Sequence, residues 1–213
     1  MNHSALGGGS LIDEQWILTA AHCLTLNVQY QIVLGKHNLE VDEPQQVIQS
    51  SAKLIRHPSF DSINPVYDVG LVKLETPLSF SANHQIAPIC LPSANDFDTF
   101  DGIDCVVSGW GQTSLNNSRT ANILQKIIVR PLCYKQCRRI WGINRSVLCG
   151  QPITQGTAYK GDSGGPLQCL VNGRYVLVGV TSFIDENLLE PSGFARVSEI
   201  IQWINEMRRG PDV

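Results

Sequence analysis

A serine with an acid and three glycines beside it lies in the run from Lys160 to Pro166, which reads Lys-Gly-Asp-Ser-Gly-Gly-Pro. Glycine adopts backbone angles that other residues avoid and allows close approach to the main chain, so this run suits a loop better than a helix or strand. A serine hydroxyl is a weak nucleophile at neutral pH. It needs a base beside it, and the base needs a third group that fixes its tautomer and stabilises its charged form. Alone, the run is as consistent with a surface turn as with a nucleophile loop. The second interpretation requires a histidine and a buried acid elsewhere in the chain.

His22 is the histidine best placed to act as the base. It ends the apolar run 16–21 and is followed by Cys23, so it is expected at the end of a strand, facing a cleft. The alternative for such a position is a histidine whose hydrogen bonds are satisfied within the core. The remaining histidines lie in the irregular start of the chain or beside turn residues and are interpreted as surface or loop residues: His3, His37, His57 and His84.

Asp68 is the candidate acid. It directly precedes the strongly apolar stretch 69–74, where partial burial is expected. A buried carboxylate requires partners, because burying an unpaired charge is costly. The alternative is an aspartate that only caps the start of a strand.

The composition excludes several classes of function. The chain has 213 residues, of which 43% are hydrophobic, a net charge of −3 and a pI of about 5.9. This charge provides no basic footprint for nucleic acid and no polybasic patch for a membrane surface. No stretch approaches the roughly 18 consecutive apolar residues of a membrane-spanning helix. The seven cysteines are mostly scattered and indicate an oxidising compartment and disulfides, with at least one thiol left over.

Short β-like segments with turn residues between them recur along the chain, and this spacing predicts an all-β sandwich or barrel. They are expected at 16–21, 29–34, 46–54, 69–74, 105–110, 124–129, 175–183 and 193–197.

Two further segments read as helices, 133–141 and 198–209. In the second, apolar residues recur with helical spacing, Ser198 is the expected N-cap, and the Gly-Pro pair at 210–211 is a stop signal. Its apolar stripe is expected to pack on the core of the chain itself rather than on a partner.

Four segments together resemble the trypsin/chymotrypsin family of serine endopeptidases. They are Leu-Thr-Ala-Ala-His-Cys at 18–23, Tyr-Asp-Val-Gly-Leu at 67–71, Ser-Gly-Trp-Gly at 108–111 and Gly-Asp-Ser-Gly-Gly-Pro-Leu at 161–167. The order His, Asp, Ser is that of the family, and the resemblance extends from about Gly8 to the final helix. It implies an all-β fold of two antiparallel six-stranded β-barrels with the active site between them. The first barrel would span about 1–95, the second about 96–198, and a C-terminal helix would follow at 199–209.

The resemblance also implies the role of each residue. Ser163 would attack the peptide carbonyl, His22 would carry the proton to the leaving amine, and Asp68 would orient His22. The backbone N–H groups of Gly161 and Ser163 would form an oxyanion hole. The implied partners are protein or peptide substrates and protein inhibitors. A monomer with no cofactor, nucleic acid or membrane is expected.

The resemblance also implies which residues would form the substrate pocket: Thr157, Ser182, Phe183, Ile184 and Ser192. Trypsin-like enzymes carry Asp where this chain has Thr157, so cleavage after Lys or Arg is disfavoured, because a buried cation would find no countercharge. The branched side chain of Ile184 should narrow the pocket, as in elastases. The expected preference is therefore for small aliphatic residues.

Two disulfides of the family match cysteines of this chain, Cys105–Cys169 and Cys137–Cys149. Three cysteines remain without an implied partner: Cys23, Cys90 and Cys133. The position that would normally pair with Cys23 is Gly7. In many members the equivalent of Cys90 bonds an upstream segment.

No metal site is expected. The loop near 36–46 is acidic, but it lacks the end carboxylates of the family's calcium loop. The pair Cys133 and Cys137 finds no second pair of Cys or His to complete a zinc site.

The start of the chain departs from the family pattern. Family zymogens are cut to release an N-terminus whose ammonium pairs with the acid before the nucleophile, here Asp162. Only seven residues precede the Gly-Gly-Ser at 8–10, so the resemblance implies an N-terminally truncated chain, without the activation site and the first strand. Asp162 would then turn towards solvent and disorder the oxyanion hole. The parent protein is expected to be secreted, although residues 1–10 show no signal-peptide pattern. The alternative function is a non-catalytic, protease-like binding or regulatory domain.

Overall fold

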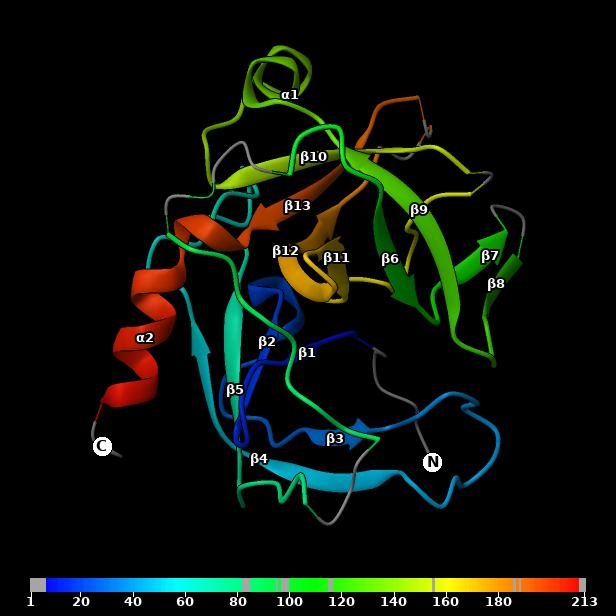
Figure 1. The fold of residues 1–213 in the computed structure, drawn as a ribbon, viewed down its shortest axis with the longest axis vertical. Coiled ribbons are helices and arrows are strands. Elements are labelled where there is room, and N and C mark those ends of the chain that lie inside the picture. Colours follow the sequence, from blue (N-terminus) through cyan, green and yellow to red (C-terminus); the bar gives the residue numbers. More distant parts are fainter. Residues whose placement is uncertain are drawn as a thin grey trace.

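A computed structural model of the chain shows two β-units that lie one above the other, with a helix along one side (Figure 1). The structure describes residues 7–81, 85–94, 96, 100–114, 117–154, 156–185, 187 and 189–210. The two units correspond to the two halves of the chain, and the C-terminal helix closes the sequence.

The first unit is a curled antiparallel sheet with five strands in the order β1-β2-β5-β4-β3. Its strands are β1 (Ser10–Leu11), β2 (Trp16–Thr19), β3 (Gln31–Leu34), β4 (Val47–Arg56) and β5 (Gly70–Leu74). β2 and β5 are largely buried: every residue of β2 and all but Lys73 of β5 are inaccessible. Each of these two strands leads to or from a candidate catalytic residue: His22 follows β2 and Asp68 precedes β5.

The second unit is a closed six-stranded barrel in the order β10-β13-β12-β11-β6-β9. Its strands are β6 (Cys105–Gly109), β9 (Gln125–Pro131), β10 (Val147–Pro152), β11 (Pro166–Val171), β12 (Arg174–Phe183) and β13 (Ser192–Arg196). A separate two-stranded ribbon, β7 (Gln112–Ser114) with β8 (Asn117–Thr120), projects from it. The Cys105–Cys169 disulfide crosses from β6 to the neighbouring β11.

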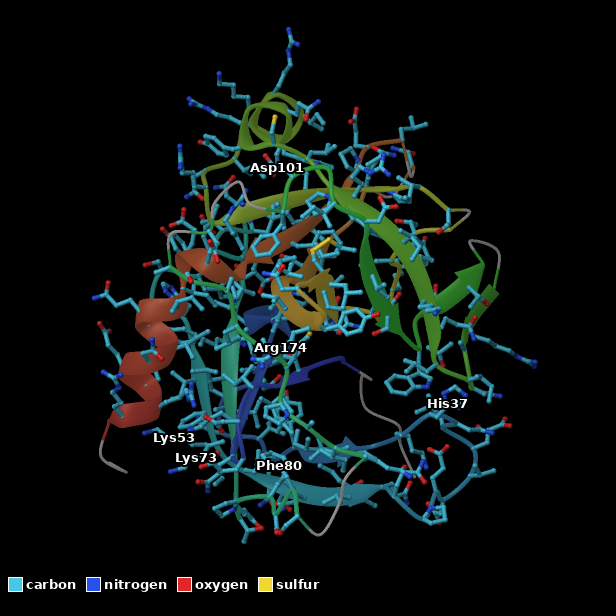
Figure 2. All side chains as sticks on the ribbon, in the orientation of Figure 1. His37, Lys53, Lys73, Phe80, Asp101 and Arg174 are labelled. Atoms are coloured by element: carbon cyan, nitrogen blue, oxygen red, sulfur yellow. A yellow bond between two sulfur atoms is a disulfide. The ribbon has the colours of Figure 1, made fainter. Side chains whose placement is uncertain are left out.

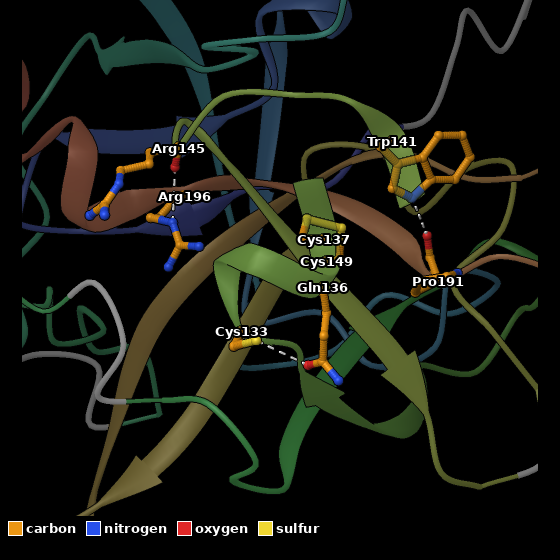
Figure 3. The surroundings of a disulfide bond; sticks show 8 residues. All are labelled: Cys133, Gln136, Cys137, Trp141, Arg145, Cys149, Pro191 and Arg196. Atoms are coloured by element: carbon orange, nitrogen blue, oxygen red, sulfur yellow. Dashed lines mark hydrogen bonds between the residues drawn. A yellow bond between two sulfur atoms is a disulfide. The ribbon is translucent and has the colours of Figure 1, made fainter. Parts of the chain in front are cut away.

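Helix α1 (Tyr134–Trp141) lies on top of the barrel and is fixed to it at two points (Figure 3). The Cys137–Cys149 disulfide ties it to β10, and the indole of Trp141 donates a hydrogen bond of 3.1 Å to the Pro191 carbonyl. The helix ends at Gly142, whose φ of 67° lies in the left-handed region that glycine adopts without strain.

Helix α2 (Ile201–Arg209) packs along the outside of both units. Its buried residues Trp203 and Ile204 join one apolar cluster with Leu71 of the first unit and Leu177 of the second. The expectation that its apolar stripe packs on the chain's own core is therefore confirmed. The expected N-cap is wrong: Ser198 lies in the preceding 3₁₀ turn, Val197–Glu199, where its buried hydroxyl has no hydrogen-bond partner among the described residues.

All eight expected strand segments form strands, and the segment 133–141 forms α1. The sequence did not predict five of the strands: β1, β7 and β8, which have only two to four residues, and the longer β10 and β11. Among the described residues no helix is long and apolar enough to cross a membrane.

Replacing Ile204 by Ala should loosen the cluster that holds the two units and α2 together. Ile204 is fully inaccessible, so the smaller side chain loses apolar contacts and leaves a cavity. We expect the free energy of unfolding in urea to fall by about 2–5 kcal/mol. Gln202→Ala, an exposed change on the same helix, should stay within about 0.5 kcal/mol of the wild type. Equal effects of the two changes would contradict this role of α2.

Candidate active site

The carboxylate of Asp68 receives two hydrogen bonds from His22. Its Oδ2 lies 2.6 Å from His22 Nδ1, and its Oδ1 accepts the His22 backbone N–H at 2.9 Å. The strand β2 ends at Thr19 and leads into the 3₁₀ turn Ala21–Cys23, which presents the imidazole to Asp68 at the start of β5. The carboxylate thereby fixes both the backbone and the ring of His22.

Each group changes the pKa of the other. Hydrogen bonds of the His22 ring to Asp68 and to the Cys23 sulfur raise the pKa of His22 well above its ordinary value, against the opposing effect of burial. Burial alone would raise the pKa of Asp68, but the hydrogen bonds and charge of His22, with a hydroxyl from Ser182, lower it instead. Asp68 is therefore ionised at neutral pH, and the protonated form of His22 is favoured in the resting site.

Ser182, expected from the sequence only as a pocket residue, is a second partner of Asp68 and its third hydrogen-bond donor. Its hydroxyl donates a hydrogen bond of 2.6 Å to Asp68 Oδ2. Ser182 belongs to β12 in the second unit, so this bond carries the site across the boundary between the units. A serine within the apolar strand 175–183 is the signal in the sequence, because a half-buried hydroxyl there requires an acceptor.

The backbone before Asp68 is held in an unusual conformation. Tyr67 has a φ of 50°, a region that non-glycine residues seldom adopt. Its ring stacks on His57 at 4.8 Å, and His57 in turn packs on Trp203 of α2. The Ser146 hydroxyl accepts the Tyr67 N–H at 3.2 Å. These contacts fix the point from which Asp68 reaches His22.

His57 is therefore not the ordinary loop residue that its neighbouring proline suggested. Burial between the two rings lowers its pKa, so the neutral imidazole is favoured. His37 lies where the first unit meets the second (Figure 2), and its carbonyl accepts the indole N–H of Trp110 at 3.0 Å. His3 and His84 lie outside the described residues.

The loop that carries Ser163 packs against the turn that carries His22. A Cβ at Gly164 would lie 2.3 Å from Thr19 Oγ1 and 3.1 Å from the Ala20 nitrogen, so only glycine allows this approach. The Ser163 carbonyl accepts the Gly8 N–H at 2.8 Å. The expected nucleophile thus lies against the end of β2, close to the expected base.

The Ser163 hydroxyl itself makes no hydrogen bond to any described residue. His22 Nε2, the ring nitrogen that Asp68 leaves free, instead faces Cys23 Sγ at 3.6 Å. The structure therefore places the three predicted residues in one region and joins two of them directly.

Asp162 does not turn towards solvent, contrary to the expectation from the sequence. Its carboxylate accepts the backbone N–H groups of Gly111 at 2.8 Å and Tyr159 at 2.9 Å. A Cβ at Gly109 or Gly111 would lie less than 3 Å from the carboxylate oxygens, so these glycines make room for it. Burial raises the pKa of Asp162, and the two N–H donors oppose this shift.

The backbone of the expected oxyanion hole is ordered by its neighbours. The Lys160 carbonyl accepts the Gln112 N–H at 2.8 Å, and because the peptide is planar and trans, the Gly161 N–H points away from Gln112. Gly161 has a φ of 100°, which favours glycine. Within the described part of the chain, the N–H groups of Gly161 and Ser163 donate no hydrogen bond, so both are free to bind an anion.

A cavity of about 560 Å³ lies beside Asp162. Of the five residues expected to form a substrate pocket, three line it: Thr157, Ile184 and Ser192. The other two lie elsewhere, since the Ser182 side chain binds Asp68 and the Phe183 ring packs edge-on against Trp141.

Cys105–Cys169 and Cys137–Cys149 are the two disulfides of the structure, and these are the pairings implied by the resemblance. Three cysteines are free thiols: Cys23, Cys90 and Cys133.

The acidic loop near 36–46 folds around a lysine. The Lys36 ammonium donates hydrogen bonds to the Val41 carbonyl and to the side chain of Gln46. No group of three or more His, Cys, Asp or Glu side chains suitable for a metal ion occurs among the residues that the structure describes.

Two comparisons with known proteins, one with family models and one with individual proteins, agree on the family. The family model described as trypsin matches residues 1–204. Chymotrypsin-like elastase family member 1 of Bos taurus is 34% identical over 208 residues, which are 93% of this chain and 77% of that protein. The protein of the same name from Canis lupus familiaris is 34% identical over 212 residues, 94% of this chain and 80% of that protein. The one from Felis catus is 35% identical over 212 residues, with coverage of 94% and 77%.

Gly7 lies where a cysteine could bond to Cys23. A Cβ added there would lie 3.7 Å from the Cys23 Cβ, within the usual range for a disulfide. We expect Gly7→Cys to form a bond with Cys23, so that titration of the folded protein finds two free thiols instead of three. Gly7→Ser is the matched control and should keep all three. Four free thiols in Gly7→Cys would contradict the placement of residue 7 beside Cys23.

Proposed function

Because the chain belongs to the trypsin/chymotrypsin family of serine proteases, we propose that it is an endopeptidase with Ser163, His22 and Asp68 as its catalytic triad. The observation that carries the proposal is the 2.6 Å hydrogen bond between His22 Nδ1 and the buried Asp68 carboxylate, beside the Ser163 loop. This bond sets the tautomer of His22, which leaves Nε2 for the serine proton.

The reaction follows from these positions. Ser163 Oγ attacks the carbonyl carbon of the peptide bond while neutral His22 takes its proton, and the acyl-enzyme forms as His22 returns the proton to the leaving amine. Asp68 keeps its negative charge and stabilises the imidazolium, as its lowered pKa requires. The free N–H groups of Gly161 and Ser163 bind the negative oxygen of the tetrahedral intermediate, an effect worth roughly 10²–10³ in rate for each donor.

The cavity beside Asp162 supports a preference for small aliphatic residues on the amino side of the cleaved bond. The hydroxyls of Thr157 and Ser192 lie 3.1 Å apart and satisfy each other, so they present no charge to a substrate side chain. Ile184 also lines the cavity, and its branched side chain should narrow the space for a substrate side chain. Asp185 also lines the cavity, but its carboxylate binds the N–H groups of its own loop. The elastase relatives are consistent with this preference.

The two disulfides and the family support a site of action outside the reducing cytosol. We therefore propose that the protein acts on proteins or peptides after secretion, as a monomer, and that protein inhibitors occupy the same cleft.

A second candidate is a non-catalytic, protease-like binding or regulatory domain. One observation favours it: His22 Nε2 contacts Cys23 and is not hydrogen-bonded to the Ser163 hydroxyl. The two candidates differ in the reactivity of Ser163, which can be measured directly.

A fluorophosphonate probe reacts only with an activated serine, so it should label Ser163 in this protein. Labelling should disappear in Ser163→Ala and fall by at least about 10³-fold in His22→Ala, since the base is lost. Ser182→Ala should reduce labelling less, because it removes one of three donors to Asp68. Labelling is read from the intact mass and the modified peptide. A protein that is folded but never labelled would support the binding domain instead.

The substrate preference can be measured with peptides that differ only at the residue before the cleaved bond. We expect kcat/KM to be highest for Ala or Val, lower for Phe and lowest for Arg. Replacing Ile184 by Gly should widen the cavity and raise the relative rate for Phe. Fastest cleavage after Arg would overturn the preference for small aliphatic residues.

The pH dependence of Ser163 labelling reports the protonation of His22. Only neutral His22 accepts the serine proton, and both Asp68 and Cys23 raise the His22 pKa, so labelling should rise with pH above the ordinary histidine value of 6.5. Cys23→Ala removes one cause of the raised pKa. The rising limb should then move to lower pH, and labelling at neutral pH should increase. Cys133→Ala, a free thiol away from His22, should leave the limb unchanged. A limb that stays or moves to higher pH in Cys23→Ala would refute this effect.

A further inference from the structure

Cys23 belongs to a chain of three interacting side chains. Asp68 holds His22 Nδ1 at 2.6 Å, and His22 Nε2 lies 3.6 Å from Cys23 Sγ. A carboxylate, an imidazole and a thiol in this order form the arrangement by which a histidine activates a cysteine. The same imidazole therefore serves two nucleophiles, the thiol of Cys23 and the hydroxyl of Ser163.

The sulfur lies on an open side of the site. Cys23 is partly exposed, and the residue facing its sulfur is Gly7, which has no side chain. A Cβ at Gly7 would be 3.6 Å from Cys23 Sγ and 3.8 Å from the Ser163 carbonyl oxygen. A substituent at the Gly7 side-chain position would therefore contact both the thiol and the backbone of the loop that carries Ser163.

The backbone of Cys23 is fixed independently of its sulfur. The Tyr30 hydroxyl donates a hydrogen bond of 3.1 Å to the Cys23 carbonyl. The Arg56 guanidinium donates to the next carbonyl, that of Leu24. Modification of the sulfur therefore leaves the hydrogen bonds of this turn in place.

The other two free thiols have different surroundings. Cys133 Sγ donates to the Gln136 side chain at 3.2 Å, at the start of α1 (Figure 3). Cys90 is more exposed than Cys23, and its carbonyl accepts the Leu177 N–H of β12. In the described part of the chain, neither sulfur contacts a histidine.

We propose that Cys23 is a thiol-modification site, at which a small disulfide such as oxidised glutathione forms a mixed disulfide that reversibly blocks His22. The part of this proposal that concerns inhibition rests on the proposed protease function. The part that concerns the reactive thiol rests on the contact with His22 alone.

The reaction is a thiol–disulfide exchange in which atoms and electrons balance. Neutral His22 accepts the proton of Cys23 on Nε2, and Sγ attacks one sulfur of the disulfide. A new S–S bond forms as the old one breaks, and the released thiolate takes the proton back from His22. The products are a mixed disulfide on Cys23 and one free thiol. A reducing thiol reverses the exchange.

The adduct would prevent the Ser163 reaction by its position. Its first atom is bonded to a sulfur that lies 3.6 Å from His22 Nε2. A group there competes with the serine hydroxyl and the substrate for the space around Nε2. The modified protein keeps its fold and loses its base.

The test is to incubate the full chain with oxidised glutathione and follow each free cysteine by peptide mass spectrometry. The adduct on Cys23 should form on the order of tenfold faster than those on Cys90 and Cys133, although Cys90 is more exposed. His22→Gln should remove this advantage. In parallel, fluorophosphonate labelling of Ser163 should fall as the Cys23 adduct accumulates and return on addition of dithiothreitol. Cys23→Ala should keep its labelling in oxidised glutathione, and Cys133→Ala should behave as the wild type.

The outcomes separate the two proposals. A Cys23 adduct that forms no faster than that on Cys90, or that leaves Ser163 labelling unchanged, overturns the modification switch while the protease function stands. A fast, His22-dependent adduct in a protein that never labels at Ser163 supports the reactive thiol and refutes the protease function.

Discussion

The buried charge of Asp68 is the constraint on which the rest of the site depends. The residue is only 2% exposed, and an ionised carboxylate at such a depth is stable only if its oxygens are hydrogen-bonded. Its donors come from both β-units: the backbone and ring of His22 from the first, and the hydroxyl of Ser182 from the second. The geometry of the site therefore depends on how the two units pack. Trp203 of α2 belongs to the same arrangement, because it packs on His57, which supports the residue before Asp68.

The sequence allowed the chemistry to be predicted better than its supports. Each candidate catalytic residue lies in a local pattern that is visible in the sequence: an apolar run before His22, a strand start after Asp68 and a glycine-rich loop around Ser163. The donor role of Ser182 depends on a contact between residues 114 positions apart, which no local pattern encodes. The wrong expectation for Asp162 has a similar cause, because the room for its carboxylate comes from two glycines some 50 residues earlier in the chain, Gly109 and Gly111. Strand β10 was missed because apolar periodicity is weak in a segment that ends in Gly-Gln-Pro.

The surroundings of His22 and its proposed role favour different protonation states of the imidazole. Asp68 and Cys23 both favour its protonated form, whereas the attack by Ser163 that we propose requires the neutral form. The resting geometry, with Nε2 facing a sulfur, is thus one that substrate binding or a change at Cys23 can alter. The loop that carries Ser163 is already fixed, since Gly164 lies against Thr19 and the Lys160 carbonyl is bound to Gln112. What can still change in the site is the protonation of His22 Nε2 and the group that this nitrogen contacts.

The hydrogen bond between His22 and Asp68 can be observed directly as the proton NMR resonance of the His22 Nδ1–H. A short, charge-assisted hydrogen bond places this resonance far downfield of ordinary amide protons. Our account predicts such a resonance in the wild type and in Ser163→Ala, a shift of its position in Ser182→Ala, and its loss in Asp68→Asn. A wild-type spectrum without it, or one in which Asp68→Asn leaves it unchanged, would contradict the claim that Asp68 organises the site.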